Sequence, residues 1–95
     1  MPAYVIAEME IHDPEQYEKY KAGVPATLEA SGGRFVVRGG ELEHLEGDWQ
    51  PKRVVVIEFD DLAAVKAWWD SPAYKEVKAL REGAATLSVI AVEGV

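Results

Sequence analysis

The chain has no cysteine, no long apolar run and no cluster of basic residues, and each absence excludes a class of protein. Without cysteine there are no disulfides and no thiolate metal ligands, and a cytoplasmic location is the expectation. No apolar run approaches the roughly 20 residues that a membrane helix needs, so no membrane partner is expected. The first residues lack a basic region followed by an apolar one, so we expect no targeting segment.

Basic residues are also scarce, because 10 Lys and Arg stand against 17 Asp and Glu, for a net charge of −7. Nucleic acids are bound by clustered Lys and Arg, so a nucleic-acid partner is not expected. The only histidines are His12 and His44, and neither has a metal-binding spacing. We therefore expect no metal and no cofactor, haem included.

The remaining composition is that of an ordinary globular protein. Its 95 residues, 48% hydrophobic and 28% charged, are typical of one domain spanning residues 1–95. Alternating or β-branched stretches predict strands at 3–11, 34–38, 53–59 and 85–92. The third of these is the most hydrophobic run of the chain, yet it contains a glutamate, Glu58.

Capping signals divide the rest of the chain into helices. Asp13-Pro14 predicts the start of a first helix, which Gly32-Gly33 ends. Pro25 lies inside this helix and predicts a kink or break, because it has no N–H to donate to the carbonyl of Lys21. Asp60-Asp61 and Ser71-Pro72 predict the starts of a second helix and a short third one.

The resulting order, β-α-β-β-α-(α)-β, predicts an α+β fold. A four-stranded antiparallel sheet with helices on one face, the ferredoxin-like arrangement, is its simplest solution. Residues 39–51 are read as the frayed end of the second strand and a long hairpin connection. A loop of this length in a small domain is expected either to cover a site or to grip a partner.

Period-two alternation assigns the side chains to the two faces of the sheet. Val5, Ala7 and Met9 are expected to face the helices. The opposite face is predicted to carry Tyr4, Ile6, Glu8, Val36, Arg38, Val54, Val56, Glu58, Ser88, Ile90 and Val92. This face is too apolar to remain exposed, so we expect a homodimer. A single bulge would reverse the assignment of a strand.

Across its whole length the sequence resembles the bacterial family called domain of unknown function 1330. The similar motifs, in the family's order, are Asp13–Tyr20, Pro25, Gly32-Gly33, Arg38–Gly40, Glu46–Trp49, Pro51–Phe59 and Trp68–Tyr74. The resemblance implies a dimeric α/β barrel, in which two ferredoxin-like protomers pack their sheets together. The wider superfamily includes cofactor-independent monooxygenases of the antibiotic-biosynthesis type, muconolactone-isomerase-like enzymes and haem-binding chlorite dismutases. The resemblance assigns no reaction.

Glu58 and Arg38 are the best candidate chemical pair. A carboxylate in an enclosed apolar pocket has a raised proton affinity, which suits a general base. The arginine would then hold a substrate carboxylate or enolate. The alternative is a structural ion pair that fixes the dimer or the hairpin register.

A second group of candidates is aromatic and basic. Tyr17, Tyr20, Trp68 and Tyr74 have helical spacing and are read either as core or as the lining of a ligand pocket. Arg53 and Arg81 are read either as anion-holding groups at its mouth or as surface ion-pair partners. His44 is a weaker candidate for a general base.

Two functions remain open at this point. The first is a dimer that binds or senses a small organic molecule without catalysis. The second is a cofactor-independent enzyme, monooxygenase- or isomerase-like, acting on a small organic acid, lactone or polyketide-like substrate. In the second case Glu58 and a tyrosine would move protons.

Overall fold

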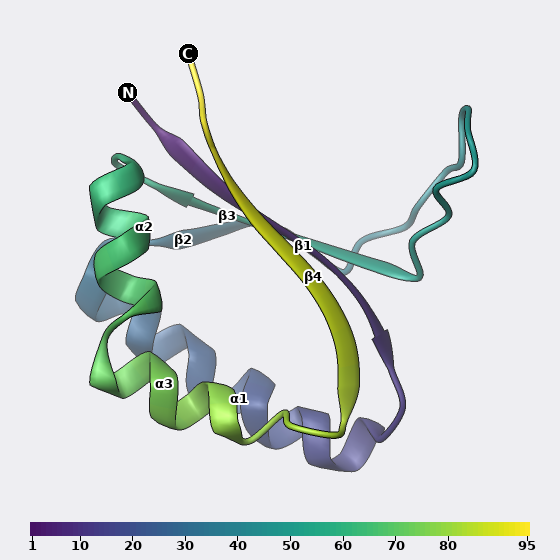
Figure 1. Ribbon diagram of the computed structural model, residues 1–95, viewed down its shortest axis with the longest axis horizontal. Helices are drawn as coiled ribbons and strands as arrows, with labels where there is room; N and C mark the ends of the chain where they lie inside the picture. The colour runs from purple at the N-terminus through teal and green to yellow at the C-terminus, as the bar shows by residue number, and fades with distance from the viewer.

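Four antiparallel strands form one sheet, and three helices cover one of its faces (Figure 1). The computed structural model describes residues 1–95. The elements in chain order are β1 (Ala3–Ile11), α1 (Pro14–Ser31), β2 (Arg34–Arg38), β3 (Arg53–Phe59), α2 (Leu62–Trp69), α3 (Pro72–Ala79) and β4 (Ala85–Glu93). The predicted ferredoxin-like arrangement is confirmed, and β4 extends one residue beyond its predicted end.

The sheet has the strand order β2-β3-β1-β4, so β1 is paired on both sides. Val5 lies opposite Ile57 of β3 and opposite Ala91 of β4. Successive side chains of a strand point to opposite faces. Val5, Ala7 and Met9 are therefore buried together under the helices, as predicted.

Helix α1 begins and ends at its predicted residues. The Asp13 carboxylate accepts the Gln16 N–H at 3.1 Å, and Gly32, with a φ of 77°, ends the helix. The helix continues through Pro25, so the predicted break is wrong. Pro25 is exposed, while the flanking Val24 and Thr27 are buried, and their packing holds the helix together across the missing bond. None of the three helices has the length and apolar character required to cross a membrane.

Aromatic rings fill the space between the helices and the sheet. Trp68 of α2 packs on Tyr74 of α3, with ring centroids 4.1 Å apart, and on Phe59 of β3 at 5.3 Å. All three rings are at most 2% exposed. The indole N–H of Trp68 donates to the Thr27 hydroxyl at 3.0 Å, so this buried polar group is satisfied.

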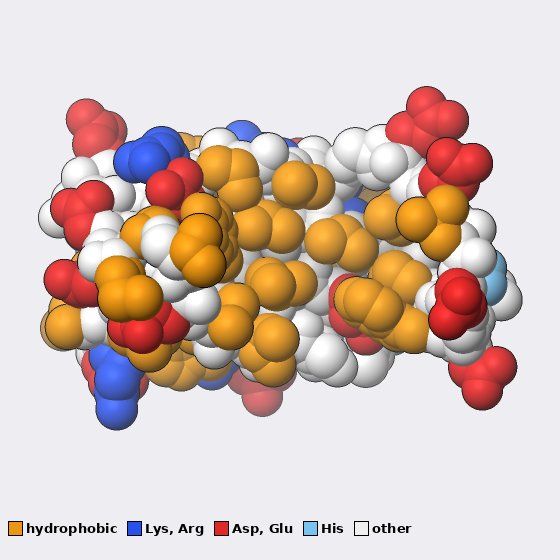
Figure 2. Space-filling model, turned by 90° about the horizontal axis from the view of Figure 1, so that it is seen from above, with side chains coloured by type: hydrophobic (Ala, Val, Ile, Leu, Met, Phe, Trp, Pro, Cys, Tyr) orange, Lys and Arg blue, Asp and Glu red, His pale blue; other side chains and the backbone are white.

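No helix covers the other face of the sheet, which we call the open face. Figure 2 shows apolar side chains gathered over its centre and acidic groups toward its ends. Tyr4, Ile6, Val54, Val56 and Val92 lie on this face, as predicted from alternation. Ile90, on the same face, is 61% exposed. An apolar surface of this kind is typical of an interface.

A β-bulge in β2 changes which of its side chains face the helices. Arg34 and Phe35 pair with Glu58 and Ile57, but the register then shifts, and Arg38 pairs with Val55. Since Val55 faces the helices, Arg38 does too. The prediction that Arg38 lies on the open face is therefore wrong, because the extra residue of the bulge reverses the alternation.

Residues 39–52, which we call the arm, join β2 to β3 and extend away from the rest of the protein (Figure 1). The arm rises on the open-face side of the sheet. Leu45 and Trp49 are 87% and 63% exposed. Within the protomer the arm does not cover the helix side of the sheet, and gripping a partner stays a prediction.

Replacing Ile90 with Glu is expected to prevent self-association and to leave the protomer folded. A charge at the centre of an apolar interface costs several kcal/mol, whereas the side chain is exposed in the protomer. Light scattering at micromolar concentration should give a dimer mass for the unchanged protein and a monomer mass for Ile90→Glu. Ala67→Glu, on the exposed side of α2, is the charge-matched control and should remain dimeric. A monomer mass for the unchanged protein would contradict the dimer.

Candidate functional site

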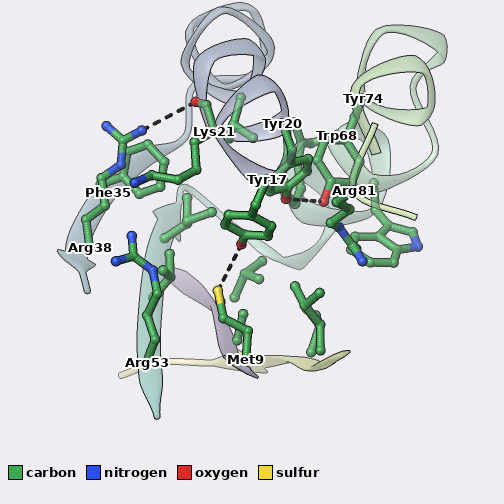
Figure 3. A pocket seen from close by; sticks show the side chains of 18 residues that line it. Met9, Tyr17, Tyr20, Lys21, Phe35, Arg38, Arg53, Trp68, Tyr74 and Arg81 are labelled. Carbon is green, nitrogen blue, oxygen red and sulfur yellow. Dashed lines mark hydrogen bonds between the residues drawn. The ribbon is translucent and has the colours of Figure 1, made fainter. Parts of the chain in front are cut away.

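A cavity of about 50 Å³ lies between the helices and the sheet, inside the protomer. All seven elements contribute side chains to it, α3 through Tyr74 in its first turn, and Arg81 follows the end of α3 (Figure 3). Of its 18 lining residues, 14 are hydrophobic. The space is sufficient for a few water molecules, or for part of a small organic molecule.

The four charged residues that line the cavity are all cationic: Lys21, Arg38, Arg53 and Arg81. The chain has two ion pairs, Lys21 with Glu18 and Arg34 with Glu58. None of the three arginines of the cavity therefore has a carboxylate partner, although the chain carries 17 acidic residues. The cavity is a local positive site in an acidic protein.

Two of these arginines have buried nitrogen atoms without a partner. The Nε atoms of Arg53 and Arg81 are buried and make no hydrogen bond. The guanidinium of Arg53 packs against Gly39, where a Cβ would collide with it and where φ is +70°. Position 39 therefore requires glycine for two reasons. Its backbone is in the left-handed region, and any side chain would occupy the space of the Arg53 guanidinium.

Arg38 is held at the edge of the cavity by two contacts. Its guanidinium lies 4.3 Å from the centroid of the Phe35 ring, in a cation–π arrangement. One of its terminal nitrogens donates to the backbone carbonyl of Lys21 at 3.5 Å, as Figure 3 shows. Strand β2 and helix α1 thus fix the side chain together.

Tyrosine hydroxyls form the neutral polar groups of the cavity. Tyr17 donates to the sulfur of Met9 at 2.9 Å, and the hydroxyls of Tyr20 and Tyr74 are 2.8 Å apart. Burial raises the pKa of Tyr17 and that of Tyr20, and the neighbouring Tyr74 raises the pKa of Tyr20 further. The Tyr17 and Tyr20 hydroxyls therefore stay protonated at neutral pH and act as hydrogen-bonding groups, not as bases.

Apart from the weaker candidate His44, all the predicted site residues but one line this cavity: Tyr17, Tyr20, Arg38, Arg53, Trp68, Tyr74 and Arg81. The exception is Glu58, which lies on the open face and pairs with Arg34 at 3.0 Å. The predicted pairing of Glu58 with Arg38 is wrong, because the bulge in β2 places the two side chains on opposite faces of the sheet.

Sequence reasoning missed Lys21, although its spacing of four residues from Tyr17 places it on the same helical face. The histidines are outside the cavity. His12 is 2.7 Å from the Thr86 hydroxyl, and His44 is 2.6 Å from the carbonyl of Gly47. No group of three or more His, Asp or Glu side chains is arranged to hold a metal ion.

The topology, the helix-covered face and the open face together define a ferredoxin-like fold. Solved structures share this fold over almost the whole chain. A protein of unknown function from Rhodopseudomonas palustris is 22% identical, with a TM-score of 0.77, over 99% of this chain and 82% of that chain. The cofactor-independent oxygenase SnoaB from Streptomyces nogalater is 16% identical, with a TM-score of 0.70, over 99% of this chain and 93% of its own.

A third similar structure is described as dimeric. It is a ferredoxin-like protein of unknown function from Bacteroides fragilis, 14% identical, with a TM-score of 0.66, over 98% of this chain and 96% of that chain. At these identities the similarity establishes the fold alone. The chain belongs to the family described as a domain of unknown function, DUF1330, whose model matches residues 2–95. A search of curated proteins finds no match.

Replacing Tyr20 with Phe is expected to reduce the loss of stability in alkali. The pKa of Tyr20 is raised above its usual 10.0, so above pH 10 the unfolded chain loses a proton that the folded protein keeps. The contribution of the buried, protonated Tyr20 to the free energy of unfolding is complete below about pH 10 and is lost as the pH rises further. Urea midpoints at about pH 8 and pH 10.5 should fall less in Tyr20→Phe than in the unchanged protein. An equal fall would contradict this account.

Proposed function

We propose that this protein binds a small organic acid with an apolar body, as a dimer with one cavity inside each protomer. The observation that carries the proposal is the charge of the cavity. Three arginines without carboxylate partners, together with Lys21, which pairs with Glu18, line a space whose other walls are apolar and aromatic. An anion with an apolar body fits both properties, because arginine binds carboxylates through paired hydrogen bonds while the aromatic walls contact the apolar part that enters the cavity.

The location of the cavity supports a ligand held by a single protomer. Its lining comes from the helix side of the sheet, whereas the expected dimer contact is on the open face. Self-association and ligand binding then use opposite faces of β1 and β3. A monomeric variant such as Ile90→Glu is therefore expected to keep the cavity intact.

A cofactor-independent enzyme is the second candidate. The cationic cavity favours it, because arginines and tyrosine hydroxyls would stabilise an enolate or phenolate form of a substrate. The similar fold of SnoaB, a cofactor-independent oxygenase, is consistent with this candidate. However, no histidine, aspartate or glutamate lines the cavity, so it offers neither an imidazole nor a carboxylate as a general base. Binding without catalysis requires fewer groups and is the function that we favour.

Matched pairs of acids and amides test the proposal. Calorimetric titration with phenylacetate, benzoate and hexanoate, each beside its neutral amide, should show at least one acid binding about tenfold more tightly than its amide. The reason is that a hydrogen bond to a charged group contributes about 1.5–3 kcal/mol, and about 1.4 kcal/mol corresponds to a tenfold change. Arg53→Gln should remove most of this preference.

Arg34→Gln is the matched control, because it makes the same substitution on the open-face side, next to Glu58. It should leave the preference for acids unchanged. Equal affinities for acids and amides, or a loss of preference in both variants, would overturn the proposal. Oxygen uptake that requires a bound hydroxybenzoate and is lost in Arg53→Gln would favour the enzyme instead.

A further inference from the structure

Pro25 and Arg38 are connected through a single carbonyl group. In an α-helix the N–H of residue 25 donates to the carbonyl of residue 21, but proline has no N–H and its ring displaces that carbonyl. The carbonyl in question belongs to Lys21, and it accepts a hydrogen bond from the guanidinium of Arg38 at 3.5 Å. Pro25 weakens α1, but it also leaves the Lys21 carbonyl free to accept the hydrogen bond from Arg38.

The same residues form the mouth of the cavity. A solvent-open depression is lined by Glu18, Lys21, Ala22, Arg38 and Arg53, and its three cations also line the inner cavity. We call this depression the mouth. Glu18 pairs with Lys21 at 3.1 Å, which leaves the two guanidinium groups as the cations without a carboxylate.

The cavity has different chemistry at its other end. Figure 3 shows Arg81 on the far side of Tyr17 from Arg38 and Arg53. Arg81 lies 5.3 Å from the centroid of the Tyr20 ring, near the Tyr20–Tyr74 hydroxyl pair. That end has one guanidinium, whereas two, those of Arg38 and Arg53, line the mouth.

We propose that the acidic group of the ligand binds at the mouth, between Arg38 and Arg53, and that Pro25 is a positioning residue for Arg38. The apolar body of the ligand then points inward, toward the rings of Trp68 and Tyr74. Two planar guanidinium groups provide the paired donors that a carboxylate accepts. The inference rests on the proposed function and assigns its ligand an orientation.

Pro25→Ala separates the two roles of this position. Alanine restores the N–H, which draws the Lys21 carbonyl back into the helical hydrogen-bond pattern and away from Arg38. Because Pro25 is exposed, no core contact is lost, and the helix should become more stable. We expect a higher unfolding temperature together with about fivefold weaker binding of the acid that binds best. The affinity for the matched amide should not change.

Pro14→Ala is the control within the same helix. Pro14 is also exposed, but it occupies the first turn, where its missing N–H has no helical partner. This variant should bind the acid as the unchanged protein does. Arg38→Gln should weaken acid binding about tenfold, and more than Arg81→Gln does.

A double-mutant cycle shows whether Pro25 acts through Arg38. In the Arg38→Gln background, Pro25→Ala should cause no further loss of acid affinity. Additive losses, an equal loss for acid and amide, or a greater loss in Arg81→Gln than in Arg38→Gln would each overturn the inference. Acid binding that is insensitive to Pro25→Ala would overturn the inference alone, whereas acids that bind no better than amides would overturn the proposed function itself.

Discussion

The pairing of β1 with both β3 and β4 is the interaction on which the rest of the structure depends. The pairing with β4 runs along the whole of β1 and that with β3 along Ala3–Met9, and together they fix which side chains of three strands face the helices. Val5 and Met9 thereby form the floor of the cavity, and Arg53 of β3 is directed into it. Once the register is set, alternation fixes the face of the sheet to which each side chain points. One face of the sheet therefore forms the core and the cavity, and the other forms an apolar surface.

Most of the fold follows from local patterns in the sequence. Caps, prolines and alternation determine the elements, and period-two counting places the side chains of β1, β3 and β4 correctly. The bulge in β2 has no such signal, because it arises from pairing with β3 and not from the residues of β2 themselves. That single extra residue accounts for the wrong pairing of Arg38 with Glu58. The cavity residues could be identified by type and helical spacing, whereas their partners depended on the register.

The continuity of α1 through Pro25 illustrates how tertiary packing overrides local propensity. A helix interior normally loses about 3 kcal/mol to a proline, yet buried neighbours on both sides hold this one together. The arginines of the cavity also reduce the stability of the fold, since they lie among apolar walls without carboxylate partners. Both losses of stability occur next to the cavity, where the Lys21 carbonyl meets Arg38. Natural proteins commonly accept such losses where a site requires them.

The two ends of the chain leave the fold at the same corner, where the N–H of Gly94 donates to the carbonyl of Pro2 at 2.7 Å (Figure 1). A short linker could therefore join Val95 to Met1, with new ends opened in the arm. The permuted chain would read β3-α2-α3-β4-β1-α1-β2 and retain every strand pairing. Its hairpin between β2 and β3 would become a contact between the two ends of the chain. The order of elements is thus cyclic, and moving the chain ends into the arm would leave the strand pairings and the elements that line the cavity intact.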